Sequence, residues 1–195
     1  MNIGEIKKDR RFWQRMLRVS GYYSGEIDGI RGPLQRAAEA AWEQTCEFLK
    51  RIGTFDQRSE ENIATLLPSA QQMAREWLKA AKEAAQKEGY DVKIICGTRS
   101  YAEQDALYKK RPRVTKARGG QSWHNFGLAF DFGIFSLDGK EYVEESPLYA
   151  VLGKLARQVQ NAEWGGDWND FKDEPHVQLR KYRTLAGARE DFERS

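Results

Sequence analysis

The chain has 195 residues, 40% of them apolar and 31% charged, a composition typical of a globular protein long enough to bury its own core. The formal net charge of +3 is too small to indicate a nucleic-acid partner, although it favours adhesion to an anionic polymer. No stretch approaches the roughly 20 apolar residues that an integral membrane helix needs.

The N-terminal segment is basic, but no apolar run follows it, so we predict no secretory signal. Apolar residues at helical spacing predict helices over 6–19 and 33–50. A third, short helix is expected to begin at Asp56 or Ser59, either of which can cap it, and to end at residue 67.

The glycine-rich turn at 22–33 contains the pattern Gly-x-Ile-Asp-Gly-x-x-Gly-Pro. With its flanking helices it resembles the small three-helix peptidoglycan-binding module found in many cell-wall hydrolases. The resemblance covers about residues 5–67 and implies Tyr22, Tyr23 and Asp28 as wall-binding candidates. Gln35 departs from the family pattern, which commonly has threonine there. The alternative is that Asp28 and the glycines only build a tight loop.

Pro68 and Ser69 mark a predicted boundary, which divides the chain into a helical module over 1–67 and a second domain over 68–195. The two cysteines, in different predicted regions, are expected to be buried free thiols rather than a disulfide.

The second domain opens with a predicted helix over 70–87, followed by a buried strand over 91–96. Ser100 can cap a further helix with Glu103 as its capping-box partner. The basic segment 111–120 lacks apolar periodicity and is predicted to be an exposed, mobile loop, with a specific anion site as the alternative reading of its charges.

The only two histidines, His124 and His176, both lie near carboxylates, which suggests a divalent metal site. His124 and Asp131 are seven residues apart. That is about 23 Å with opposite facing in a strand, and about 10 Å along the axis of a helix. The chain must therefore turn between them, and the segment 125–127 has suitable turn chemistry.

From Leu128 the sequence reads as a strand with two unlike faces. The core face takes Leu128 and every second residue to Ile134, whereas Asp131 stands between the small residues Ala129 and Gly133 on the other face. The same alternation after His176 places Gln178 on the site face, with Val177 and Leu179 in the core.

Two imidazoles and one carboxylate would leave a tetrahedral Zn²⁺ one open position for water, which is the arrangement of a catalytic rather than a structural site. Asp173 and Glu174 both precede His176 and could move the proton of that water. Spacing alone does not decide between them.

The pattern Ser122-x-His124-x-x-Gly-x-Ala-x-Asp131, followed by Trp164-Gly-Gly-Asp-Trp168 and Asp-x-Pro-His176, is highly specific. It resembles the D-alanyl-D-alanine carboxypeptidase and L-alanyl-D-glutamate peptidase family of zinc enzymes, and most of all the endolysin branch. The resemblance implies that His124, Asp131 and His176 bind one zinc ion and that Asp173 is the catalytic acid and base.

An upstream motif, Gly97-x-Arg99-Ser-x-x-x-Gln104, matches the same family, although Thr98 stands where an aromatic residue is common. It implies that Arg99 stabilises oxyanion charge or binds a substrate carboxylate; a structural ion pair is the alternative. Ser122, Gln104, Trp164 and Trp168 are further candidates for substrate contact. For the tryptophans, including Trp123, core packing is an equal alternative.

We therefore expect an α+β protein, with a small antiparallel sheet flanked by helices and an N-terminal three-helix module. The expected function is a zinc endopeptidase that cleaves the peptidoglycan stem peptide, at L-Ala-D-Glu by resemblance. The alternatives are a D-Ala-D-Ala carboxypeptidase, a non-catalytic wall-binding protein and a lysozyme, which would need two carboxylates at a sugar bond.

The expected biological setting comes from the endolysin resemblance and the missing signal. It is a monomeric phage lysin that stays in the host cytoplasm until release and then acts on the cell wall. A helix is predicted over 148–159. The basic segment after Leu179 is expected to be a solvated, partly frayed helix, with wall adhesion as the alternative.

Overall fold

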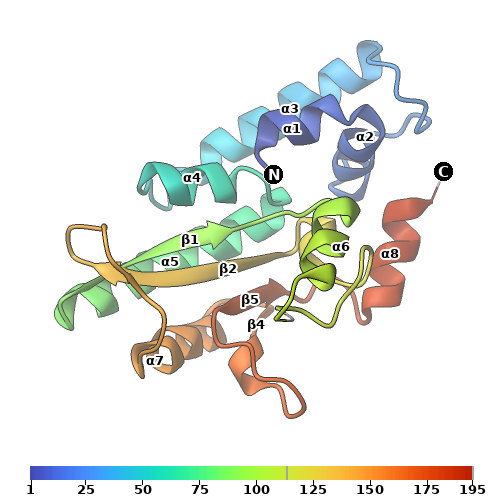
Figure 1. Ribbon diagram of the computed structural model, residues 1–195. Coiled ribbons are helices and arrows are strands. Elements are labelled where there is room, and N and C mark those ends of the chain that lie inside the picture. Colours follow the sequence, from blue (N-terminus) through green and yellow to red (C-terminus); the bar gives the residue numbers. More distant parts are fainter. Residues whose placement is uncertain (113, 195) are drawn as a thin grey trace.

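The computed structural model describes residues 1–112 and 114–194 and is an α+β fold (Figure 1), as predicted. Arg113, part of the predicted basic loop, and Ser195 lie outside the described residues. The elements in chain order are α1 (Ile3–Lys8), α2 (Arg10–Val19), α3 (Pro33–Leu49), α4 (Gln57–Ile63), α5 (Pro68–Lys87), β1 (Tyr90–Cys96), α6 (Tyr101–Lys109), η1 (Trp123–Phe126), β2 (Ala129–Ser136), β3 (Tyr142–Val143), α7 (Leu148–Lys154), η2 (Leu155–Gln158), β4 (Ala162–Trp164), η3 (Gly165–Asp167), β5 (His176–Leu179) and α8 (Leu185–Glu193).

The sheet is small and antiparallel in every described pairing, which confirms the predicted architecture. Its strand order is β1-β2-β5-β4, and the short β3 pairs with β2. The register places Asp131 of β2 opposite His176 of β5 on one side and opposite Cys96 of β1 on the other. Strand pairing therefore brings together residues that are 35 and 45 positions from Asp131 in the chain.

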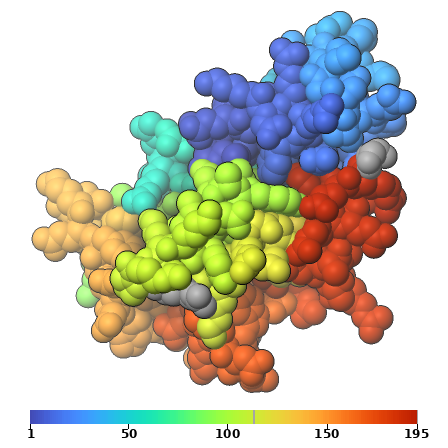
Figure 2. Space-filling view, turned by 45° about the vertical axis from the view of Figure 1, so that its right-hand side comes forward, coloured from blue at the N-terminus to red at the C-terminus, as the bar shows by residue number. Residues whose placement is uncertain are grey.

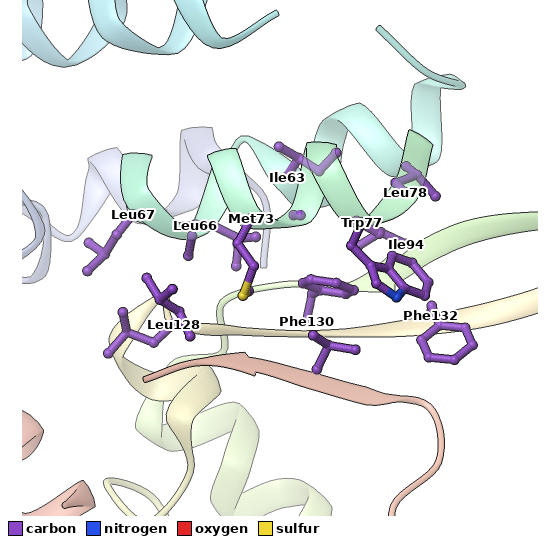
Figure 3. Packing of buried hydrophobic residues seen from close by; sticks show 14 of the residues in the cluster. Ile63, Leu66, Leu67, Met73, Trp77, Leu78, Ile94, Leu128, Phe130 and Phe132 are labelled. Carbon is purple, nitrogen blue, oxygen red and sulfur yellow. The ribbon is translucent and has the colours of Figure 1, made fainter. Parts of the chain in front are cut away.

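The long helix α5 covers the apolar face of the sheet (Figure 1), and the close view of Figure 3 shows its side chains above those of β2. Trp77 is fully buried, with its ring centroid 5.2 Å from that of Phe130 and 4.6 Å from that of Phe132. The alternation predicted for β2 is confirmed, because Leu128 and Ile134 belong to the same core. This packing leaves the opposite face of β2 and β5 free to carry polar groups.

The predicted first helix is two helices, because Asp9 interrupts it. The Asp9 side chain accepts a hydrogen bond from the backbone N–H of Phe12, which caps α2. Asp56 caps α4, so the first of the two predicted capping residues is correct. The capping box of Ser100 and Glu103 is also present. The helix predicted over 148–159 consists of α7 and the 3-10 helix η2.

The predicted domain boundary coincides with the beginning of α5 at Pro68. Buried side chains before and after it belong to one hydrophobic core. Met16 of α2, for example, lies in the same cluster as Phe126 of η1. Independent folding of residues 1–67 stays a prediction.

The C-terminal helix corrects another expectation. We predicted a solvated, frayed helix after Leu179, but α8 packs beside α2, and Figure 2 shows the two ends of the chain in contact. Phe192 is 2% exposed, and its ring lies 5.1 Å from Phe12 and 5.4 Å from Phe126. The apolar residues Ala188 and Phe192 fix the helix, which the count of basic residues did not reveal.

No helix in the described part of the chain is both long enough and apolar enough to cross a membrane.

Candidate metal centre

Three predicted ligand atoms meet on the polar face of the sheet. His124 Nε2 lies 3.1 Å from Asp131 Oδ1 and 3.1 Å from His176 Nδ1, and the last two atoms are 3.2 Å apart. The three residues come from η1, β2 and β5. They form a near-equilateral triangle of one carboxylate oxygen and two ring nitrogens.

The turn predicted between His124 and Asp131 is the 3-10 helix η1, which ends at Gly127. Gly127 has φ of +66°, a left-handed conformation that other residues adopt at a cost. A Cβ at this position would lie 2.9 Å from Met16 Cε and 3.1 Å from the Leu67 backbone nitrogen. Glycine here both reverses the chain and lets the N-terminal helices pack under the metal centre.

Each histidine is oriented by a second hydrogen bond. His124 Nδ1 lies 2.7 Å from the carbonyl oxygen of Gly97, which can only accept, so Nδ1 carries the hydrogen and Nε2 offers a lone pair. His176 Nε2 lies 3.0 Å from Gln178 Oε1, so His176 presents Nδ1. Such outer partners set the tautomer and the ring orientation of metal-binding histidines. Gln178 shares the site face with His176, as predicted.

The triangle fits zinc. Zinc–nitrogen and zinc–oxygen distances of about 2.0 to 2.2 Å in a tetrahedral site place ligand atoms about 3.3 to 3.6 Å apart, close to the separations here. Each ring turns one nitrogen toward the same point, and both rings are buried. His124 and His176 are 1% and 5% exposed.

Asp131 is the electrostatic centre of the site. Burial raises the pKa of its carboxyl group, but His124, His176 and Arg99 outweigh that effect and hold the pKa well below its ordinary value. Burial alone would lower the pKa of His124. The Asp131 carboxylate more than offsets this effect and raises the pKa of His124 in the metal-free protein to about 9. A metal cation that replaces the His124 proton therefore finds a site already arranged for positive charge.

Arg99 lies against this centre and contacts the protein through each of its three guanidinium nitrogens. One terminal nitrogen donates to Asp131 Oδ2, the other lies 3.3 Å from Gln104 Oε1, and Nε lies 3.1 Å from Cys96 Sγ. The sequence left two interpretations of Arg99 open, a role toward the substrate and a structural ion pair. The observed contacts include the ion pair, which is formed with Asp131. The guanidinium group orients the carboxylate whose other oxygen faces the histidines.

Cys96 is a neighbour of the centre that sequence reasoning missed. Its sulfur and the ligand atoms of His124 and Asp131 all lie within 4.8 Å of one another. Burial raises the pKa of the thiol, but His124 and Arg99 outweigh it and bring the pKa below its ordinary value. Both cysteines are free, as predicted, although they are half-buried rather than buried. The position of Cys96 follows from its register opposite Asp131.

The metal centre opens into a cleft of about 490 Å³. Of the predicted residues, Ser122 and Trp168 line it together with the three ligands, Arg99 and Asp173. The Trp168 ring lies 5.2 Å from that of His176, and its indole N–H donates to Glu163 at 2.6 Å. Trp123 also lines the cleft. These positions are compatible with substrate contact.

Two predicted substrate residues lie behind the cleft wall. Gln104 is fully buried, and its amide joins Arg99 to the backbone oxygen of Ala117. Trp164 is 4% exposed, and its indole N–H donates to the carbonyl oxygen of Glu174 at 2.7 Å. Core packing is therefore the role that the position of Trp164 fits, and Gln104 acts through its neighbours.

Asp173 and Glu174 differ in position. Asp173 lines the cleft beside Pro175 and His176, whereas Glu174 is not part of the cleft wall. Burial raises the pKa of Asp173 above its ordinary value, although His176 opposes the rise. A Cβ on Gly165 would lie 2.4 Å from the Asp173 carbonyl oxygen, so the glycine of the Trp-Gly-Gly-Asp-Trp motif allows this approach. Position and a raised pKa both favour Asp173 as a proton carrier.

Of the wall-binding candidates near the N-terminus, Tyr23 is buried, Tyr22 is half-buried and Asp28 is exposed, and all three form hydrogen bonds within the protein. Asp28 Oδ1 accepts hydrogen bonds from Gln14 at 2.8 Å and from the Ile30 backbone at 2.8 Å. The Tyr23 hydroxyl group donates to the Glu26 carbonyl oxygen, and Tyr22 donates to Thr45. These contacts are those of a loop-building motif.

The segment that holds this centre matches known proteins. The family model described as D-alanyl-D-alanine carboxypeptidase matches residues 115–179, which contain all three ligands. The peptidoglycan L-alanyl-D-glutamate endopeptidase CwlK of Bacillus subtilis is 40% identical over 120 residues, or 51% of this chain and 67% of CwlK. The chain belongs to the M15 peptidase family.

M15 peptidases are zinc-dependent, so the predicted zinc and the metallopeptidase class are confirmed. Among solved structures, the Serratia marcescens L-Ala D-Glu endopeptidase ChiX is 28% identical. That alignment covers 64% of this chain and 88% of ChiX, with a TM-score of 0.49.

Proposed function

We propose that this M15 peptidase is a peptidoglycan endopeptidase that cleaves the stem peptide between L-Ala and D-Glu. The observation that carries the proposal is one cleft that holds the His124, Asp131 and His176 triangle together with Asp173. The 40% identity to an L-alanyl-D-glutamate endopeptidase supports the choice of bond.

His124, Asp131 and His176 would hold the zinc ion, which when bound would supply Lewis acidity toward the amide carbonyl and the attacking water. Asp173 accepts the proton of the attacking water and then donates it to the leaving amine. Because burial raises its pKa, Asp173 can hold that proton between the two steps. The Trp168 ring lies beside that of His176 and forms part of the cleft wall.

Arg99 has a supporting part in this mechanism. Its contacts with Asp131, Cys96 and Gln104 use all three guanidinium nitrogens. It keeps Asp131 ionised and fixes which oxygen faces the histidines, so its charge reaches the substrate through Asp131. We propose this role for Arg99 in place of the oxyanion stabilisation or substrate-carboxylate binding that the resemblance implied.

The second candidate is cleavage of D-Ala-D-Ala, because the matching family model carries the description of a carboxypeptidase. Digestion of purified peptidoglycan by zinc-loaded and chelator-treated protein, with products identified by mass, separates the two. We expect zinc-dependent release of peptides that begin with D-Glu. Release of free alanine would contradict the endopeptidase proposal and support the carboxypeptidase. New reducing sugars would indicate a glycan-cleaving enzyme.

The phage lysin role, the location in the host cytoplasm before release and the monomeric state are further parts of the proposal. They rest on the endolysin-like motifs Gly-Gly-Asp-Trp and Asp-x-Pro-His in this sequence. Wall binding by residues 1–67 rests on the glycine-rich motif. Sedimentation with insoluble peptidoglycan tests it directly. The intact protein is compared with a variant whose turn at 22–33 carries substitutions.

A further inference from the structure

One wall of the active-site cleft is a basic loop. Val114, Thr115, Lys116 and Ala117 all line the cleft that contains the metal ligands. Across it stands Phe171, and the Lys116 ammonium lies 5.0 Å from the centroid of the Phe171 ring. Val114 is 57% and Phe171 48% exposed, so both apolar side chains are open to a bound substrate. This part of the cleft rim therefore combines two exposed apolar side chains with one ammonium group.

The loop is tied to the metal centre from behind. Gln104 Nε2 donates to the Ala117 carbonyl oxygen at 3.0 Å, and its Oε1 accepts from Arg99 at 3.3 Å. Arg99 in turn pairs with the ligand Asp131. These contacts connect the backbone next to Lys116 to the metal ligand Asp131. The Lys116 side chain itself is exposed.

Within the described part of the cleft wall, Lys116 is a cation that has no ion pair with the protein. Among the described residues that line the cleft, Arg99 and Lys116 carry positive charge. Arg99 is committed to Asp131, Gln104 and Cys96. Lys116 has no ion pair within the described part of the chain, and its contact with Phe171 leaves its N–H groups available.

We propose that Lys116, steadied by Phe171, is the specificity residue that binds the free carboxylate next to the scissile amide. The inference rests on the proposed function. In the stem peptide the D-Glu residue is linked onward through its γ-carboxyl group, so its α-carboxylate stands on the carbon that bears the scissile nitrogen. An enzyme whose cleft presents the unpaired ammonium group of Lys116 will prefer the D-Glu α-carboxylate over the α-carboxamide, which has the same shape without the charge.

The test uses two synthetic peptides, L-Ala-γ-D-Glu-L-Lys and the same peptide with the D-Glu α-carboxylate converted to a carboxamide. The zinc-loaded wild-type protein is compared with Lys116→Met, which retains the aliphatic length without the charge. Lys109→Met is the matched control, because Lys109 is exposed on α6 and does not line the cleft. Zinc content and thermal unfolding confirm that each variant is folded.

We expect wild-type protein to favour the acid, and Lys116→Met to lose about tenfold in kcat/KM on the acid, mainly through KM, as expected for one charge-assisted hydrogen bond. On the carboxamide the two proteins should be equal. Lys109→Met should match wild type on both peptides. The preference of wild type should also shrink as salt rises, because the ammonium group is exposed.

A second variant keeps the proposal separate from loop damage. Phe171→Leu preserves apolar bulk but removes the ring under the ammonium group, and a loss of about threefold on the acid alone is expected. Equal loss on both peptides by Lys116→Met would overturn the proposal while the proposed function stands. If wild-type protein cleaves neither peptide at L-Ala-D-Glu, the proposed function fails and this inference fails with it.

Discussion

The metal centre and the glycine-rich loop at 22–33 were both predicted from sequence motifs, yet they use their polar residues in opposite ways. In the loop, Asp28 and Tyr23 accept or donate hydrogen bonds within the loop and to Gln14. In the metal centre, two rings and a carboxylate direct their free atoms at one point. A motif whose polar groups form hydrogen bonds with one another stabilises the structure. A motif whose polar groups keep donor or acceptor atoms available can bind a ligand.

The largest expected effect concerns the unsatisfied residue Asp173. Asp173→Asn should retain zinc and lose about 10³-fold in kcat, because an amide cannot accept the proton of the attacking water. Glu174→Gln is the matched control, since Glu174 lies outside the cleft wall, and it should keep most of its turnover. Steady-state kinetics with zinc content measured on the same samples decides this, and the reverse order would reassign the base to Glu174.

The next effect concerns the support of a ligand rather than the ligand. Gln178 orients His176 through a 3.0 Å hydrogen bond. Gln178→Leu should therefore weaken zinc affinity by about 10- to 100-fold, as removal of outer partners of metal-binding histidines does. Competition with a chromophoric chelator measures it. Unchanged affinity would mean that packing alone sets the ring orientation.

Zinc affinity should also depend on pH. The His124 pKa of about 9 in the metal-free protein means that zinc must displace a proton below that pH. The affinity should rise about tenfold per pH unit between pH 7 and 8 and level off above about pH 9. Because the pKa is raised on folding, protonation of His124 stabilises the metal-free protein fully below about pH 6.5, and this stabilisation is lost as the pH rises through about 9. Zinc titrations at several pH values would contradict this if the affinity were flat.

The smallest effect on catalysis is expected in the loop. Gln14 is fully buried and contacts Asp28, Tyr23 and the backbone N–H of Gly29. Gln14→Leu should lower the free energy of unfolding by about 1 to 3 kcal/mol, because the Gly29 N–H loses its partner. Turnover of a soluble peptide should not change. Chemical denaturation and kinetics on the same variant test this; lost turnover with normal stability would tie the loop to the active site.

Much of the centre could be predicted because its signals are local. Alternation placed Asp131, His176 and Gln178 on one face, and the turn chemistry at 125–127 anticipated η1. The break at Asp9 was also locally encoded, since an aspartate three residues before Phe12 is a capping signal. The regular spacing of apolar residues over 6–19 predicted one continuous helix and so concealed the capping signal at Asp9.

Other features depend on long-range pairing and were not predictable in the same way. Cys96 reaches the metal centre because β1 pairs with β2 in one register, and Arg99 follows it there. The docking of α8 depends on contacts of Phe192 with the rings of Phe12 in α2 and Phe126 in η1, both of which are distant from it in the sequence. No local pattern specifies these partners.

The central claim is that His124, Asp131 and His176 hold one catalytic zinc ion. The most direct measurement is a crystal structure of the zinc-loaded protein with anomalous data collected on both sides of the zinc absorption edge. We predict a single strong peak about 2.0 to 2.2 Å from His124 Nε2, His176 Nδ1 and one oxygen of Asp131, with Asp173 facing its open side. A peak that is bound by other residues, or that omits either histidine, would contradict the account.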